Sequence, residues 1–132
     1  MDDDDARLEA LSAAAARHPG LQVLVLHGSR ARGEARAGSD WDLACLGSDE
    51  LDFGALHVTA VTVLGTDAVD LVDLERASAL LRFRAARDGR CLFEDRAGRH
   101  LDFVLAATHF WCDAGPIIRR AQQSVLADLG PR

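Results

Sequence analysis

The chain has 132 residues and a formal net charge of -6, with 48% hydrophobic and 27% charged residues. This length predicts one domain with one core over residues 1–132, and the composition is that of a globular rather than a disordered protein. The acidic balance argues against broad attraction to nucleic acid, which needs a basic face.

The sequence also argues against membrane insertion and against a disulfide framework. No apolar run approaches the roughly 20 residues of a membrane span, and the acidic start has the wrong charge for a targeting signal. The three cysteines, Cys45, Cys91 and Cys112, show no C-x-x-C spacing, which favours free thiols over disulfides or a zinc site. We therefore expect a cytoplasmic protein without a membrane contact.

The first half of the chain predicts a helix followed by two strands. Helix-forming residues run from position 4 or 5 to 17, with the aspartates as a solvated helix start. The apolar run LQVLVLH, residues 21–27, fits a strand buried on both faces, and SDWDLACLG predicts the next strand. Between these strands, Ser29 is expected to cap a short helix over residues 30–34.

The second half predicts further alternation and a helical end. SDELDFGALHVTAV is an ambiguous helix, because Gly54 and its β-branched end weaken it. AVDLVDL, residues 68–74, predicts a third strand, a helix follows over about 76–88, and CLFE fits a short strand. The pattern is helical over about 97–129, with Pro116 near the first turn of a final helix. Apolar or core positions expected on this segment are Leu101, Leu105, Thr108, Phe110, Trp111, Ile118, Ala121 and Val125.

Two aspartates separated by one residue carry the first part of the functional prediction. Alternate side chains of a strand share a face, so Asp40 and Asp42 would point the same way, about 6–7 Å apart. Two carboxylates at this distance repel each other unless a divalent cation lies between them. Oxygen ligands of this kind suit Mg²⁺ or Mn²⁺, and substrate phosphates usually complete the coordination of these ions.

A phosphate-binding segment lies ten residues before this pair. Gly28 allows close approach of the backbone, the Ser29 hydroxyl can donate a hydrogen bond, and a helix N-terminus attracts anions. Arg30 and Arg32 add positive charge beside it. His27 precedes this segment, and we expect its ring to bond to the backbone rather than to a ligand.

A third carboxylate would complete a two-metal site, and the strand at residues 68–74 offers two candidates. Asp70 and Asp73 are three positions apart, so they face opposite sides of the strand. Only one of them can join Asp40 and Asp42, and periodicity alone does not choose between them.

These motifs resemble those of a known superfamily. HGSRARGEARAGSDWDL, residues 27–43, matches the G-S-x10-D-x-D signature of the DNA polymerase beta-like nucleotidyltransferases, and VDLVDL is similar to their third-carboxylate strand. The small size, GSRARG, RAARDGRCLFE and the D-x-G-P-I-I-R-R-A ending resemble the minimal nucleotidyltransferases, the MntA-like antitoxins of HEPN/MNT toxin–antitoxin pairs. The resemblance implies an α/β (α+β) nucleotidyltransferase fold, a small mixed β-sheet backed by helices with a helical C-terminus.

The resemblance also implies an activity and a partner. Members transfer AMP from ATP, with two Mg²⁺ ions or Mn²⁺, to a tyrosine hydroxyl of a HEPN-type RNase toxin, with which a hetero-oligomer is expected. Two readings remain as alternatives: an antitoxin that neutralises the toxin by binding alone, and transfer to a small-molecule hydroxyl. The chain contains no tyrosine, so a tyrosine acceptor must belong to another protein.

Site residues are carried over by motif. Asp40 and Asp42 would bind the metals, and Asp70 would hold the catalytic metal and help to deprotonate the acceptor hydroxyl. The choice of Asp70 over Asp73 rests partly on this resemblance. The nucleotide-binding set is Gly28, Ser29, Arg30 and Arg32.

Overall fold

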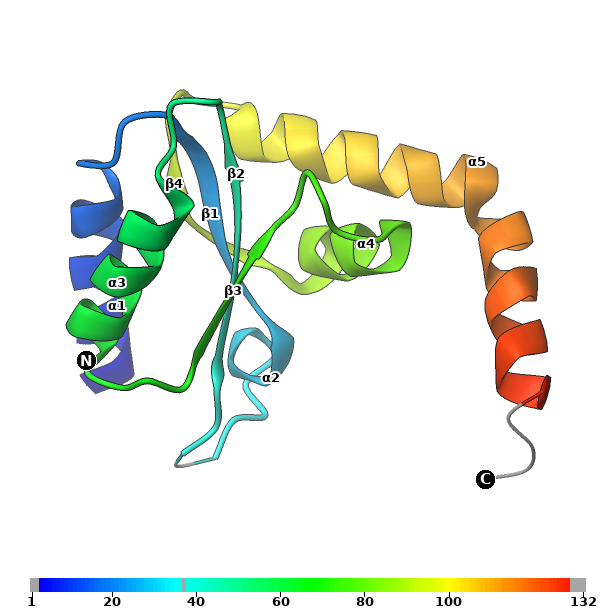
Figure 1. The fold of residues 1–132 in the computed structure, drawn as a ribbon, viewed down its shortest axis with the longest axis horizontal. Coiled ribbons are helices and arrows are strands. Elements are labelled where there is room, and N and C mark those ends of the chain that lie inside the picture. The colour runs from blue at the N-terminus through cyan, green and yellow to red at the C-terminus, as the bar shows by residue number, and fades with distance from the viewer. Residues whose placement is uncertain (1–2, 37, 129–132) are drawn as a thin grey trace.

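The computed structural model describes residues 3–36 and 38–128, with side chains up to residue 113. Helices and strands alternate along this part of the chain, as the sequence predicts (Figure 1). In chain order the elements are α1 (Asp3–Ala15), β1 (Leu21–His27), α2 (Gly28–Ala31), β2 (Trp41–Gly47), α3 (Phe53–Leu64), β3 (Val69–Asp73), α4 (Ala79–Asp88), β4 (Arg90–Glu94) and α5 (Arg99–Asp128).

The four strands form one mixed sheet in the order β3-β2-β1-β4. β1 is antiparallel to both of its neighbours, β2 and β4, whereas β2 and β3 are parallel. Parallel neighbours need a crossover connection, and α3 supplies it. The expected small mixed sheet with helices is therefore confirmed.

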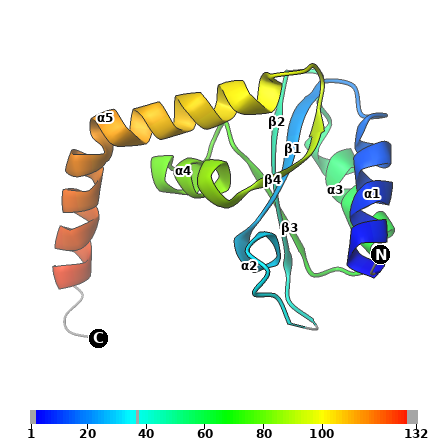
Figure 2. The ribbon, with the colours of Figure 1, turned by 180° about the vertical axis from the view of Figure 1, so that it is seen from behind.

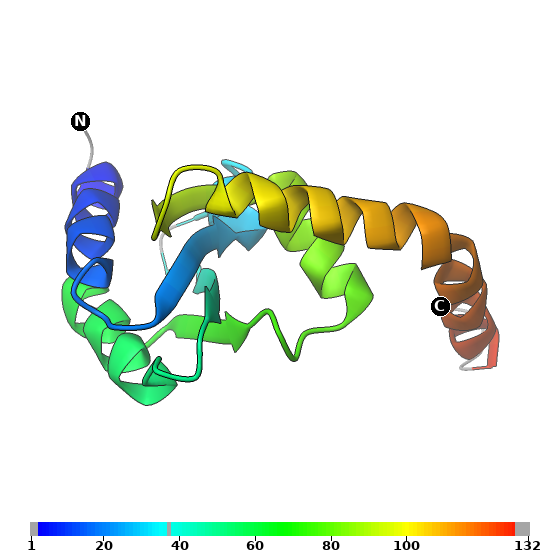
Figure 3. The same ribbon diagram turned by 90° about the horizontal axis from the view of Figure 1, so that it is seen from above.

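Helices cover both faces of the sheet, which explains why its strands are apolar on both sides (Figures 1 and 3). α1 and α3 lie on one face, and α4 and the first part of α5 lie on the other. Strand alternation separates the two cores. The first core contains Leu8, Leu11, Leu24, Leu26, Trp41, Leu43, Leu56, Leu64, Val69 and Leu71, and the second contains Ala44, Leu74, Ala85, Ala86, Phe103 and Ala107.

α3 forms despite its weak helical pattern, because its two ends are well capped. The Asp52 carboxylate accepts a hydrogen bond from the Ala55 N–H at 3.0 Å, which is the geometry of an N-cap. Gly65 ends the helix with φ +69°, the left-handed conformation that glycine adopts most readily. The buried face of α3 repeats every four residues through Leu56, Ala60 and Leu64.

α5 is one long helix rather than two shorter ones. Pro116 lies inside α5 instead of near the start of a separate helix, so this expectation is wrong. A proline in a helix interior removes one backbone hydrogen bond and bends the helix. α5 changes direction in its second half and leaves the sheet (Figures 1 and 2). The side chains of Ile118, Ala121 and Val125 and the end of the predicted segment at residue 129 lie outside the described residues.

In the first half of α5, the face that packs against the core is not the face that carries Leu101 and Leu105, which we predicted to be the apolar face. Leu101 and Leu105 are 57% and 60% exposed, and Phe110 is 55% exposed although we expected it in the core. Phe103, Ala107 and Trp111, which are four positions apart, are buried instead. Trp111 stacks on Phe83 of α4 with ring centroids 5.3 Å apart, so packing against α4 determines the buried face. None of the described helices is both long and apolar enough to cross a bilayer.

Candidate active site

The site begins where β1 ends and the chain makes a sharp turn. Gly28 has φ +72°, and a β-carbon there would lie 2.2 Å from Oδ2 of Asp42, so only glycine fits. α2 begins at Gly28 rather than at residue 30, and its N-cap is His27, which makes no side-chain capping hydrogen bond. Ser29 therefore lies within the first turn of α2, and its predicted role as the cap is wrong.

Asp42 lies at the centre of three neighbouring strands. It pairs with His27 on the antiparallel strand β1 and with Asp70 on the parallel strand β3. Residues paired in this way project from the same face of a sheet. Asp42 and Asp70 therefore point to the face that α4 and α5 cover, while Trp41 and Leu43 pack in the core below α1 and α3.

Asp40 precedes β2 instead of lying within it as predicted. The strand begins at Trp41, whose N–H donates to the carbonyl of Ala68 at 2.8 Å. Trp41 is 3% exposed and faces the core, as expected, whereas Asp40 on one side of it is exposed and Asp42 on the other is half-buried. The position of Asp40 therefore depends on the loop before β2 and not on the sheet ladder.

Asp40 and Asp70 both lie within electrostatic range of Asp42. Burial raises the pKa of Asp42 above its ordinary value. His27 counters this rise in the Asp42 pKa, while the charges of Asp70 and Asp40 increase it and Arg32 lowers it. The site therefore concentrates negative charge beside one strand end, which is a cost that a bound cation would remove.

Asp73 lies at the other end of β3, away from these carboxylates. It pairs with Cys45 in the parallel ladder, and Cys45 belongs to the core below α1 and α3. The Asp73 carboxylate accepts a hydrogen bond from the N–H of Glu75 at 2.9 Å, so it stabilises the turn after β3. Of the two candidates for the third carboxylate, the structure brings only Asp70 next to Asp42.

The two arginines of the motif have different surroundings. The Arg32 side chain is 42% exposed, pairs with Glu34 at 3.2 Å and lies close enough to Asp42 to lower the pKa of that carboxyl. The Arg30 side chain is only 12% exposed and extends to Asp4 of α1. Arg32 therefore lies within electrostatic range of Asp42, whereas the Arg30 guanidinium is held at α1.

The donor set fits a hard divalent cation in its chemistry, although the side chains do not form a closed cage. All three candidates are carboxylates, and the charges of Asp70 and Asp40 add to the rise in the Asp42 pKa that burial causes first. Within residues 3–36 and 38–128, no group of three His, Cys, Asp or Glu side chains converges tightly enough to hold an ion alone. Mg²⁺ commonly takes one or two protein carboxylates and completes its shell with water and substrate phosphates.

His27 is the residue whose contribution the sequence did not reveal. Its pairing with Asp42 makes it the main opposing influence on the raised pKa of that carboxyl. Its Nε2 atom is buried and has no hydrogen-bond partner among the described residues. Only the antiparallel register of β1 and β2 places the ring there, and that register is invisible in the chain order.

Comparison with known proteins identifies relatives of this chain. Residues 9–97 match the family model described as Polymerase beta, Nucleotidyltransferase. A curated relative is the protein adenylyltransferase MntA of Aphanizomenon flos-aquae (strain 2012/KM1/D3), 37% identical over 89 residues. That alignment covers 58% of this chain and 59% of the relative, so the chain matches about three fifths of the relative's length.

Solved structures give wider coverage at lower identity. A crystal structure of a toxin–antitoxin with AMP-PNP matches with a TM-score of 0.64 and 27% identity, covering 90% of this chain and 98% of that one. A mutant MntA–HpeT toxin–antitoxin structure matches with a TM-score of 0.60 and 28% identity, covering 92% and 98%. Both matches cover at least 90% of this chain.

Proposed function

The chain belongs to the polymerase beta nucleotidyltransferase family, and from this membership we propose that it transfers AMP from ATP to a tyrosine hydroxyl of a HEPN-type toxin. The observation that carries the proposal is the side-by-side placement of Asp42 and Asp70, with Asp40 within electrostatic range and Gly28 against the Asp42 carboxylate. The relative described as a protein adenylyltransferase and the toxin–antitoxin structure with AMP-PNP support the reaction and the nucleotide.

The proposal gives each residue a task in one displacement. The acceptor oxygen attacks the α-phosphorus of ATP, pyrophosphate leaves, and the acceptor proton passes to the Asp70 carboxylate. The backbone at Gly28, the Ser29 hydroxyl and the Arg32 guanidinium bind the phosphates. Asp40, Asp42 and Asp70 would hold two Mg²⁺ ions or Mn²⁺, which supply charge neutralisation at the phosphates and a lowered pKa of the acceptor hydroxyl.

The wider setting follows from the same proposal. Residues 1–132 form one minimal nucleotidyltransferase domain, which the family match over 9–97 and the 90% structural coverage support. The protein acts in the cytoplasm, where ATP is available and cysteines remain reduced, and it forms a hetero-oligomer with its toxin. The acceptor tyrosine belongs to the toxin, because this chain has none.

Incubation with labelled ATP, Mg²⁺ and the toxin encoded beside this protein tests the reaction. Label should appear on toxin tyrosine with the wild type, and EDTA should abolish the transfer. The Asp42→Asn variant should give no label and should still fold, because it removes one charge without changing side-chain size. Absence of label from the wild type with every nucleotide and metal would overturn the proposal.

A cell-protection assay distinguishes catalysis from neutralisation by binding alone. Cells that express the toxin should survive with the wild type and not with a double Asp40→Ala, Asp42→Ala variant. Equal protection by the double variant would assign neutralisation to occlusion of the toxin. Label on an added aminoglycoside instead of the toxin would assign the acceptor to a small molecule.

A further inference from the structure

We propose that Arg30 is a positioning residue that holds the loop carrying Asp40 against α1, and not a ligand of the nucleotide phosphates. The inference rests on the proposed function, because it assigns a role at that site. Its starting point is the burial of the Arg30 side chain, which is 12% exposed although it carries a full charge. A charge that is removed from water in this way needs fixed partners.

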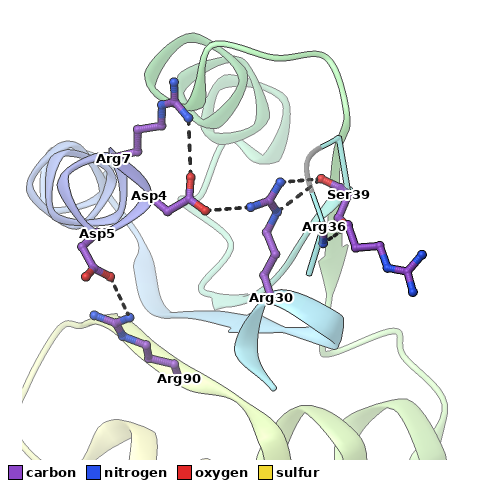
Figure 4. A network of polar contacts seen from close by, with 7 residues as sticks. All are labelled: Asp4, Asp5, Arg7, Arg30, Arg36, Ser39 and Arg90. Carbon is purple, nitrogen blue, oxygen red and sulfur yellow. Dashed lines mark hydrogen bonds and ion pairs between the residues drawn. The ribbon is translucent and has the colours of Figure 1, made fainter. Parts of the chain in front are cut away.

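Protein groups engage each of the three guanidinium nitrogens. Nε and Nη2 of Arg30 donate to the carbonyl oxygen of Ser39 at 3.2 and 2.8 Å, and Nη1 donates to Oδ2 of Asp4 at 3.0 Å (Figure 4). The guanidinium carbon also lies 3.9 Å from the centroid of the Trp41 ring, a cation–π contact. These contacts use three of the five guanidinium N–H donors and hold the group between α1 and the Ser39 carbonyl.

These contacts surround Asp40 in the sequence. The Ser39 carbonyl comes directly before Asp40, and the Trp41 ring comes directly after it. A local turn extends the same anchor, because the Ser39 N–H donates to the Arg36 carbonyl and the Arg36 N–H donates to the Ser39 hydroxyl. Since Asp40 lies outside the sheet ladder, Arg30 holds the backbone before this carboxylate through the Ser39 carbonyl and contacts the side chain of the residue after it.

The other end of this anchor is the acidic start of α1. Asp4 pairs with Arg30 and also with Arg7 at 3.5 Å, and Asp5 pairs with Arg90 of β4 at 3.8 Å (Figure 4). The aspartates that looked like a solvated helix start are therefore contact points for three arginines. Through them the loop before β2 is connected to the helix layer on the opposite face of the sheet from Asp42.

Only arginine can make all of these contacts from one position. Its planar group can donate twice to one carbonyl, pair with a carboxylate and stack on an indole ring, whereas a lysine ammonium is a compact point charge. Arg30→Lys therefore keeps the charge and loses the geometry. At a phosphate-binding position, lysine would keep the charge but lose bidentate contact, and the loss would appear in the KM for ATP.

Three variants separate the two roles: Arg30→Lys, Asp4→Asn, and Asp3→Asn as the control. Asp4→Asn removes the carboxylate partner of Arg30 on α1, and Asp3 is an exposed aspartate on the same turn of α1. Circular dichroism should show that all three variants fold. Amide hydrogen exchange of the peptide covering residues 33–41 should become faster in Arg30→Lys, and to a smaller extent in Asp4→Asn, and should match the wild type in Asp3→Asn.

Fluorescence and kinetics complete the test. In a Trp111→Phe background, which leaves Trp41 as the sole indole, Arg30→Lys should shift the emission of Trp41. In the transfer assay we expect a kcat lower by about tenfold to a hundredfold, with the KM for ATP changed less than about twofold. Asp4→Asn should lower kcat less, and in the same direction.

The outcomes distinguish failure of this inference from failure of the proposed function. A raised KM for ATP with an unchanged kcat in Arg30→Lys would identify Arg30 as a phosphate ligand and overturn the inference. Unchanged exchange of residues 33–41 in Arg30→Lys would also overturn it. If the wild type transfers no AMP, the proposed function fails, and the exchange and fluorescence results still decide whether Arg30 holds the loop.

Discussion

Alanine substitutions at Gly28 and Gly33 distinguish the cost of backbone strain from the cost of a clash with a site residue. Both have a positive φ, +72° and +73°, but a β-carbon on Gly28 would lie 2.2 Å from Asp42 Oδ2, whereas one on Gly33 would meet nothing within 4 Å. We expect Gly33→Ala to lower the free energy of unfolding by about 1 kcal/mol and to leave transfer intact. Gly28→Ala should cost more and reduce transfer at least about tenfold, because the alanine displaces the Asp42 carboxylate.

Urea unfolding and the transfer assay on both variants check this prediction. If Gly28→Ala retained the activity of Gly33→Ala, the contact with Asp42 would have no bearing on the chemistry.

Asp42 illustrates a conflict between stability and function at a single residue. Its pKa is raised, so the folded protein binds the Asp42 proton more tightly than the unfolded chain does. The ionised carboxylate therefore destabilises the fold at pH values above its raised pKa, and this cost disappears as the pH falls through that pKa. Asp42→Asn should raise Tm by about 2 °C at neutral pH without divalent cations, while transfer is lost.

Thermal unfolding at several pH values tests the sign of this effect. The advantage of Asp42→Asn should shrink as the pH is lowered through the raised pKa. A lower Tm for the variant at neutral pH would show that Asp42 stabilises the fold.

At the scale of single elements, α3 links the two parallel strands that carry Asp42 and Asp70 and depends on its caps. Asp52→Ala removes the hydrogen bond to the Ala55 N–H and should cost about 1 kcal/mol of unfolding free energy. Asp52→Asn is the matched control, since asparagine caps about as well and only the charge is lost. Chemical denaturation measures both values, and equal stabilities for alanine and asparagine would contradict a capping role.

The elements also show how far sequence reasoning reaches. All four strands were predicted, CLFE included, because apolar residues fill both faces of a covered sheet, as at Val23, Leu24 and Val25. The buried face of α5 could not be predicted, because both faces carry large apolar residues and only packing against α4 selects Phe103 over Leu101. The short α2 was predicted near its place with the wrong cap, since His27 and Ser29 are only two positions apart and local propensity favours serine.

At the scale of the whole molecule, the three cysteines are buried to different extents, so their rates of modification report on local and on global unfolding. Cys112 is exposed, Cys91 is half-buried with a raised pKa, and Cys45 is 1% exposed in the core with a pKa raised by burial to about 12. With a thiol reagent at neutral pH, Cys112 should react first and Cys91 more slowly. Cys45 should react only at the rate of global unfolding, which mass spectrometry of labelled peptides can follow.

Labelling in native buffer provides the check on this order. Reaction of Cys45 in native buffer as fast as that of Cys112 would show that the sheet opens without global unfolding.

The site as a whole was less predictable than its motif. The spacing of Gly28, Ser29, Asp40 and Asp42 singled out the segment because it matches the G-S-x10-D-x-D signature, whereas glycine and aspartate alone are also common in ordinary turns. The surroundings of Arg30 and His27 were not predictable, since they depend on Asp4 and Asp42 reached across the fold. Charge alone makes Arg30 and Arg32 look alike, and burial distinguishes them.

The register of β2 and β3 has a consequence for how the site tolerates sequence change. A slip of one residue would send Asp70 into the core and bring Val69 or Leu71 to the surface beside Asp42. The fold resists that slip because two apolar side chains would lose burial and a carboxylate would gain it. The alternation of apolar and polar residues in β3 therefore fixes its register against β2. A one-residue insertion or deletion that shifted this register would destabilise the fold as well as misplace the Asp70 carboxylate.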